Sequence, residues 1–191
     1  GWQSQLVELV TRPQVKAVGE MGLDFYRDFS PRDVQIEVFR AQLAIAAAAN
    51  KPAFVHDRDS GGMVHQLLSD QTPKPPGVVI HCFTGTRDEL LGYLDAGYHI
   101  GITGWVCDQR RGAQLRELVP LIPLDRLLVE TDAPFLRPHN APKAQAKGDR
   151  RNEPALLCYV VEQVAQLYGC RQAAIATATH DNAAALFGLT D

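Results

Sequence analysis

Short, largely apolar runs recur along the chain, and four of them end in a residue of a type that binds metal ions. They are Val15 to Gly19 before Glu20, Pro52 to Val55 before His56, Val78 to Ile80 before His81, and Leu127 to Val129 before Glu130, Thr131 and Asp132. Such a run, bounded by polar residues, is typical of a strand buried on both faces of a parallel sheet. We therefore predict strands over Val15–Glu20, Pro52–His56, Val78–Phe83, Tyr98–Thr103 and Leu127–Asp132.

Between these runs, apolar residues recur at the spacing of amphipathic helices. The segments are Gln3–Val10, Pro31–Ala49, Met63–Leu68, Leu90–Leu94, Leu115–Val119 and Leu156–Leu167, followed by two short alanine-rich helices. Ser30 and Asn152 are expected to be helix caps, and Thr86 with Glu89 matches a capping box. The stretches Met21–Asp28 and Phe135–Arg151 are expected to be loops.

Strands that alternate with helices predict a parallel α/β sheet, and we expect a (β/α)8 barrel. About five βα units are present where a closed barrel needs eight, so three further units are expected before Gly1. The whole chain, Gly1–Asp191, is interpreted as one domain of this barrel. Active sites of such barrels lie at the carboxyl ends of the strands, so we expect Glu20, His56, His81 and Asp132 to converge.

The charge and cysteine content narrow the class of protein. A net charge of -3 over 191 residues provides no global basic field for nucleic acid, so a polyanionic substrate needs local arginines or bound cations. No apolar run is long enough to span a membrane. Cys82, Cys107, Cys158 and Cys170 show no paired spacing, which favours free thiols in a reducing compartment. We expect a cytoplasmic monomer without an obligate protein partner.

Two carboxylates and two imidazoles at strand ends suit a divalent metal site. Each residue also has a structural explanation, because Glu20 can be a solvated loop charge and Asp132 a turn cap. His56 and His81 can simply form hydrogen bonds at strand ends. Four such residues in succession favour the metal site. The remaining histidines, His65, His99, His139 and His180, do not share this position and are interpreted as structural or surface residues.

Three further residues are candidates for substrate binding. Arg58 lies two residues after His56 and is either a phosphate clamp or a surface partner of Asp57 or Asp59. Arg151 is either a solvated charge or a phosphate contact. Trp105 follows a predicted strand and is either a loop anchor or a platform on which a base stacks.

Six motifs together resemble the TatD family of metal-dependent deoxyribonucleases. They are Gly19-Glu20-Met21-Gly22-Leu23-Asp24, Val55-His56-Asp57-Arg58, Ile80-His81-Cys82-Phe83-Thr84-Gly85, Gly101-Ile102-Thr103-Gly104-Trp105, Val129-Glu130-Thr131-Asp132-Ala133-Pro134 and Arg150-Arg151-Asn152-Glu153-Pro154. The resemblance implies a (β/α)8 hydrolase of DNA, often a 3′–5′ exonuclease, with up to two divalent ions (Mg or Mn, with Zn as an alternative). It also implies that Glu20 bridges two ions, that His56 and His81 hold one, and that Asp132 helps to hold the other. Most members also carry a His-x-His pair on a first strand, which this chain does not contain.

The expected reaction is hydrolysis of a phosphodiester by metal-activated water, with Asp132 accepting the proton of the water. A small-molecule amidohydrolase or phosphotriesterase is the first alternative. Several of those enzymes carry a modified lysine at the end of the fourth strand, where Glu20 stands here. A non-catalytic binding module is the second alternative, and the presence of all four expected ligands argues against it.

Overall fold

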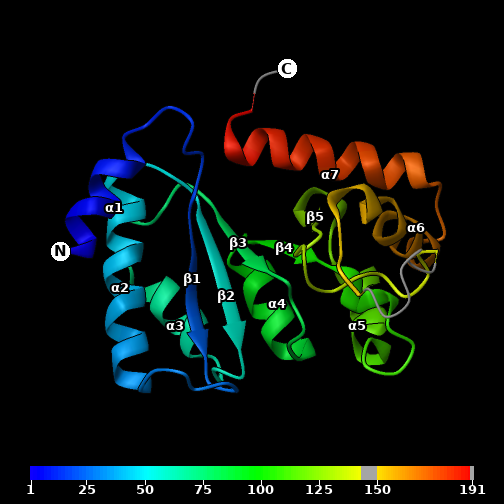
Figure 1. Cartoon of the computed structure of the whole chain (residues 1–191), viewed down its shortest axis with the longest axis horizontal. Helices are drawn as coiled ribbons and strands as arrows, with labels where there is room; N and C mark the ends of the chain where they lie inside the picture. The colour runs from blue at the N-terminus through cyan, green and yellow to red at the C-terminus, as the bar shows by residue number, and fades with distance from the viewer. Residues whose placement is uncertain (143–149, 190–191) are drawn as a thin grey trace. The chain divides into compact units, whose positions relative to one another are not determined.

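The computed structural model describes residues 1–142 and 150–189. Residues 143–149, within the predicted loop Phe135–Arg151, lie outside the described part. The helices are α1 (Trp2–Val10), α2 (Arg32–Ala48), α3 (Met63–Asp70), α4 (Arg87–Asp95), α5 (Ala113–Leu118), α6 (Leu157–Tyr168) and α7 (Gln172–Phe187). The strands are β1 (Val18–Asp24), β2 (Ala53–Arg58), β3 (Val78–His81), β4 (His99–Ile102) and β5 (Leu127–Val129). Figure 1 shows these elements along the chain.

The five strands belong to one sheet in the order of the sequence, β1-β2-β3-β4-β5. The pairs β1–β2, β2–β3 and β4–β5 are parallel. Helices separate successive strands in the chain, as parallel pairing requires. The predicted alternation of parallel strands with helices is therefore confirmed. Among the described residues, the structure contains no helix that is both long and apolar enough to cross a membrane.

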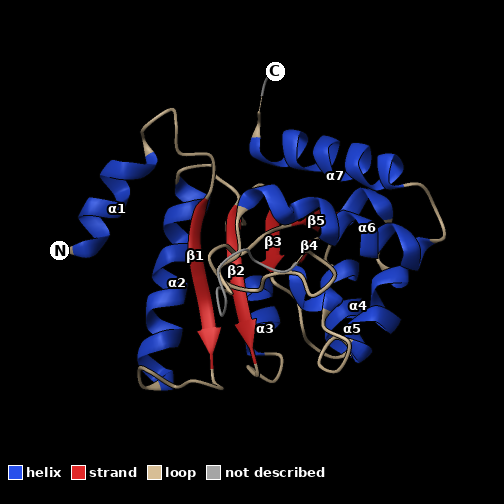
Figure 2. Cartoon of the chain, turned by 45° about the vertical axis from the view of Figure 1, so that its right-hand side comes forward, coloured by secondary structure: helices blue, strands red, loops and turns tan. Residues whose placement is uncertain are grey.

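The chain forms two compact units, which are described separately. The first comprises residues 1–81, 85–99 and 183–191, and the second comprises residues 82–84 and 100–182. In the first unit, α2 packs on β1 and α1 packs on α2 (Figures 1 and 2). The core of this unit includes Leu23, Phe39, Val55 and Val79, each with no exposed surface. The helices therefore cover β1, which pairs with β2.

In the second unit, β4 and β5 pair through Ile100 with Leu127 and Ile102 with Val129. Helix α6 packs against β5 and the preceding short helical turns, and it buries Val160 and Val164 completely. The Asn182 side-chain amide donates hydrogen bonds to the carbonyls of Leu124 (2.7 Å) and Leu127 (2.8 Å). These bonds fasten α7 to the start of β5.

Several predicted boundaries are wrong. The first strand begins at Val18 and continues through Asp24, so the first half of the predicted loop Met21–Asp28 is strand. The second strand likewise continues beyond His56 to Arg58. Both strands are longer than predicted because residues 21–24 of β1 pair with residues 55–58 of β2. The pairing satisfies the backbone hydrogen-bonding groups of both segments. The fourth strand, His99–Ile102, is one residue shorter at each end than the predicted Tyr98–Thr103.

Three helix predictions also need correction, whereas one is confirmed. The Thr86–Glu89 capping box is present at the start of α4. In α2 the N-cap is Pro31, without a side-chain cap, and not Ser30. Asn152 does not cap α6, which begins at Leu157 after a short helical turn. The two predicted alanine-rich helices are one helix, α7, because alanine continues a helix without any break.

Candidate metal centre

Glu20 lies within β1, at a break in the strand register, and not at the strand end as predicted. The pairing with β2 is regular from Met21 onward, but it shifts between Val18 and Met21. A bulge of this kind changes the direction in which a side chain points, and bulges are common beside active sites. Glu20 therefore lies in the irregular part of the strand pair, where side chains depart from the regular alternation of a strand.

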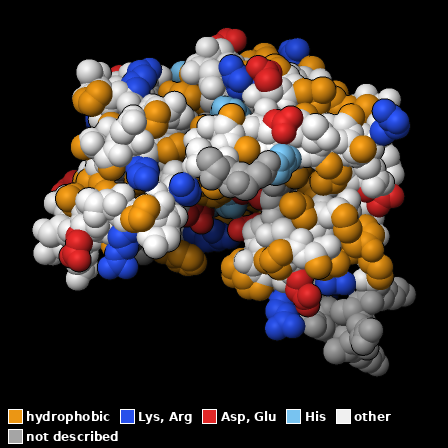
Figure 3. Space-filling view, turned by 90° about the horizontal axis from the view of Figure 1, so that it is seen from above, with side chains coloured by type: hydrophobic (Ala, Val, Ile, Leu, Met, Phe, Trp, Pro, Cys, Tyr) orange, Lys and Arg blue, Asp and Glu red, His pale blue; other side chains and the backbone are white. Residues whose placement is uncertain are grey.

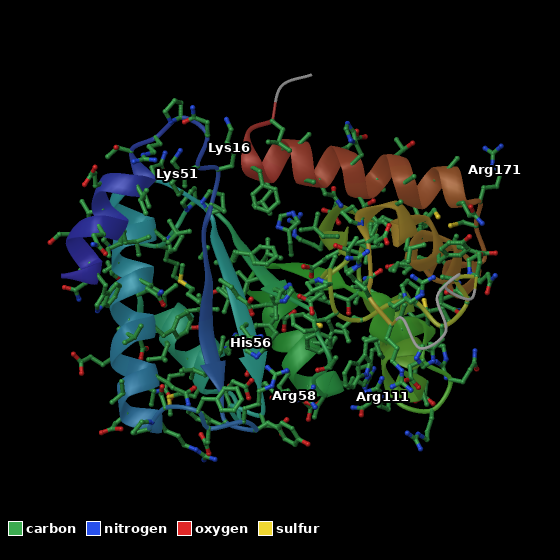
Figure 4. The ribbon with its side chains drawn as sticks, viewed as in Figure 1. Lys16, Lys51, His56, Arg58, Arg111 and Arg171 are labelled. Carbon is green, nitrogen blue, oxygen red and sulfur yellow. The ribbon has the colours of Figure 1, made fainter. Side chains whose placement is uncertain are left out.

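His56 on β2 and His81 on β3 occupy the same position in the sheet register. Directly paired residues on neighbouring strands project from the same face of the sheet. Their ring centroids are 6.3 Å apart. Figure 4 shows His56 toward the carboxyl end of β2, with Arg58 beyond it. The two imidazoles therefore lie side by side at one edge of the first unit.

Glu20 brings a carboxylate to both imidazoles. Its Oε1 atom lies 2.9 Å from Nδ1 of His56 and 3.8 Å from Nε2 of His81. One ligand-type atom from each of the three residues falls within 4.8 Å of the other two. The His81 side chain is 7% exposed and the Glu20 side chain 51%, so the cluster has a buried base and an open side. Two nitrogens and an oxygen at this spacing fit a divalent cation.

The electrostatics of the cluster keep Glu20 ionised. The hydrogen bond with His56 lowers the pKa of Glu20 below its ordinary value and outweighs the opposing effect of partial burial. The nearby His81 ring acts in the same direction. A carboxylate that is charged at neutral pH is the form that binds a cation.

Asp24 is a nearby residue that was not predicted as part of the site. Its Oδ2 atom lies 3.4 Å from Nε2 of His56, on the side of the ring opposite to Glu20. Burial disfavours the charged form, but the Arg27 backbone N–H, His56 and the Arg27 guanidinium together lower the pKa of Asp24. The alternation of buried Met21 and Leu23 could have indicated that the strand continues to Asp24.

Asp132 lies in the second unit, whereas the other three predicted ligands lie in the first. It follows β5 with a positive φ of 55°, and its carbonyl accepts a hydrogen bond from the backbone N–H of Phe135. Asn152 supports the same turn by donating to the Thr131 carbonyl at 2.7 Å. The structure thus brings Glu20, His56 and His81 together, and the convergence of Asp132 with them stays a prediction.

Arg58, at the end of β2, is the substrate candidate that belongs to the same unit as the cluster. Its guanidinium carbon lies over the Tyr26 ring, 5.0 Å from the centroid. Its Nε atom is 3.9 Å from Asp59, which is a long ion pair. The ion pair with Asp59, one of the two roles predicted for Arg58, is therefore present. Arg58 also lies on the same strand as His56, two residues further along.

Trp105 and Arg151 lie in the second unit. The guanidinium of Arg111 covers one face of the Trp105 ring at 4.7 Å from the centroid, and Asp108 holds Arg111 by a 2.6 Å ion pair. The Arg151 side chain is 66% exposed and lies 3.7 Å from Glu153. On the face drawn in Figure 3, lysines and arginines are interspersed with acidic side chains, which agrees with the low net charge.

Comparisons with known proteins agree on one family. A family model described as TatD related DNase matches residues 2–188. The chain is 48% identical, over 99% of its length and 74% of the relative, to a protein of Escherichia fergusonii named 3′-5′ ssDNA/RNA exonuclease TatD. It is 50% identical to a protein of the same name from Rahnella sp., over 99% of this chain and 73% of the relative.

A similar solved structure is that of a TatD homolog from Escherichia coli K12. It superposes with a TM-score of 0.85 at 28% sequence identity, and the match covers 98% of this chain and 70% of that chain. The fold and the sequence therefore point to the same group of proteins.

Proposed function

The chain belongs to the TatD related DNase family, and from this membership we propose that it is a divalent-metal-dependent exonuclease that hydrolyses DNA from the 3′ end. The observation that carries the proposal is the cluster of Glu20, His56 and His81, three ligand-type side chains from three adjacent strands. The names of the two relatives, ssDNA/RNA exonuclease, favour single-stranded substrates and leave RNA as a second substrate.

The donor set supports binding of Mg or Mn, with Zn as an alternative. Imidazole suits Zn and other transition ions, whereas carboxylate suits Mg and Mn. A bound divalent ion supplies an activated water and neutralises charge on the phosphoryl oxygens. Glu20 exposes half of its side chain, so its carboxylate has room to bridge a second ion. Asp132 is proposed to help hold that ion and to accept the proton of the attacking water.

Arg58 is proposed to bind a substrate phosphate. It stands at the carboxyl end of β2, two residues beyond His56, and its flat guanidinium matches the geometry of a phosphate. Arg151 is proposed as a second phosphate contact and Trp105 as a stacking platform for a base.

We also infer that the five strands and their helices form part of a (β/α)8 barrel, within a single domain from Gly1 to Asp191. The parallel order of the strands supports this inference, and closure of such a barrel needs eight strands. An experimental structure of the natural gene product tests it. A closed ring of eight strands is the expected result, and an open sheet would contradict it.

The proposed activity is tested with single-stranded DNA labelled at either end. We expect Mg²⁺ or Mn²⁺ to support stepwise shortening from the 3′ end, and EDTA to stop it. Glu20→Gln keeps the shape of the side chain but removes its charge, so we expect near-complete loss of activity. Glu89→Gln, in the exposed capping box of α4, is the matched control. Metal-dependent cleavage of esters or amides without cleavage of DNA would instead favour the small-molecule hydrolase.

A further inference from the structure

The two ring nitrogens of His56 face two different carboxylates. Nδ1 lies 2.9 Å from Glu20, and Nε2 lies 3.4 Å from Asp24. A neutral imidazole has one nitrogen that offers a lone pair and one that carries a proton. If one nitrogen binds a metal ion, the partner of the other nitrogen decides which tautomer the ring adopts. The strand register places Asp24 near the His56 ring, because β1 pairs Gly22 with His56 and Asp24 with Arg58.

Nε2 of His56 is the nitrogen that still needs an acceptor. It is buried, and it makes no hydrogen bond of normal geometry with the described residues. The Asp24 carboxylate stands 3.4 Å away and is an acceptor to which this nitrogen can donate. Nδ1, by contrast, points toward Glu20 and the open side of the cluster.

The Asp24 carboxylate is itself held in place. The Arg27 backbone N–H donates to Oδ1 at 2.8 Å, and the Arg27 guanidinium donates to Oδ2 at 2.9 Å. The backbone N–H of Asp24 donates to the Gln35 side chain of α2 at 2.9 Å. The backbone N–H groups of Arg27 and Asp24 already restrict this segment, and the Arg27 guanidinium adds a further contact. A carboxylate restricted in this way can orient a histidine ring.

We propose that Asp24 is a positioning residue, which accepts the Nε2–H of His56 so that Nδ1 is the atom presented to the metal ion. The inference rests on the metal centre proposed above. Hydrogen-bonded carboxylates of this kind fix the tautomer of a ligating histidine and raise its basicity, and their loss typically weakens metal binding about 10–100-fold.

Two other roles for Asp24 lead to different results. If Asp24 only anchors the loop after β1 through Arg27, removal of the Arg27 side chain should weaken metal binding as much as removal of the Asp24 carboxylate. If Asp24 is itself a ligand through Oδ2, His56 binds the ion through Nε2 and carries its proton on Nδ1. Ring tautomer and metal affinity together separate these roles.

The test measures Mn²⁺ affinity by titration calorimetry for the wild type, Asp24→Asn and Arg27→Ala, with thermal melts to confirm that each variant folds. We expect Asp24→Asn to bind Mn²⁺ about 10–100-fold more weakly with unchanged stoichiometry. We expect Arg27→Ala to stay close to the wild type, because the backbone N–H of residue 27 still holds Oδ1.

The second readout is the ¹⁵N chemical shift of the His56 ring in protein loaded with Zn²⁺. We expect the proton on Nε2 and the ion on Nδ1. A proton on Nδ1, or an unchanged Mn²⁺ affinity in Asp24→Asn, would overturn this inference and leave the metal centre intact. A wild-type protein that binds no Mn²⁺ would overturn both the metal centre and the inference.

Discussion

At the scale of single residues, Arg58 is the proposed phosphate contact nearest to the cluster along the chain, because it ends the strand that carries His56. We expect Arg58→Ala to weaken binding of single-stranded DNA by roughly 1.5–3 kcal/mol, the usual loss for a hydrogen bond to a charged group. Mn²⁺ affinity should not change, since Arg58 is assigned to phosphate. Fluorescence anisotropy and metal titration measure the two quantities. A loss of metal binding would instead place Arg58 in the support of the metal site.

Asp108 shows how a single carboxylate organises the segment that carries Trp105. It accepts hydrogen bonds from the backbone N–H groups of Arg111 (2.9 Å) and Arg110 (3.0 Å), in addition to its ion pair with Arg111. The Arg111 backbone N–H is the largest of the effects that hold the pKa of Asp108 well below its ordinary value, against the opposing effect of burial.

This lowered pKa leads to a prediction about pH. The contribution of Asp108 to stability is complete above the unfolded pKa of about 3.9, and it is lost as the pH falls through the lower folded pKa. We expect Asp108→Asn to reduce the free energy of unfolding by roughly 1.5–3 kcal/mol at pH 7. The deficit should shrink at pH 3. Urea unfolding at pH 7 and pH 3 measures this loss of stability, with the exposed Asp125→Asn as a control. An equal loss at both pH values would contradict the lowered pKa of Asp108.

At the scale of elements, the pairing of β1 with β2 depends on Gly22. Its φ is +143°, and a Cβ atom added there would lie 1.9 Å from the carbonyl oxygen of His56. The backbones of the two strands therefore lie very close together beside His56, a proposed metal ligand. No residue with a side chain fits that position unless β1 moves away from β2.

We therefore expect Gly22→Ala to destabilise the protein and to weaken Mn²⁺ binding, because β1 also carries Glu20. Gly62→Ala is the matched control, since Gly62 also has a positive φ, of 85°, but has open space around its Cβ position. The control should cost only the conformational penalty, roughly 1–2 kcal/mol. Thermal unfolding and metal titration of both variants test this. Equal effects on Mn²⁺ binding would show that the close approach is unimportant.

At the scale of the whole molecule, the proposed centre draws its ligands from three successive strands, so metal binding requires the folded first unit. A ligand that binds only the folded state stabilises it, by about 2.7 kcal/mol at a concentration about 100 times its Kd. We expect Mn²⁺ to raise the Tm accordingly and EDTA to reverse the change. Glu20→Gln should show almost no response to Mn²⁺. An equal response in this variant would place the bound ion elsewhere.

The sequence by itself determined the features that depend on near neighbours. The βα alternation follows from the periods of apolar residues, and the Thr86–Glu89 capping box follows from a spacing of three residues. His56 and His81 were predicted together because both follow apolar runs, and register-matched parallel strands place them side by side.

Only the tertiary structure decided how β1 meets β2. The register shift at Glu20 and the approach of Asp24 to His56 both depend on partners more than thirty residues away in the chain. The single helix α7 and the stacking of Arg111 on Trp105 were also visible only in the fold. A local pattern can show that a strand is buried, but cross-strand hydrogen bonds select its register, and the register determines which side chains meet.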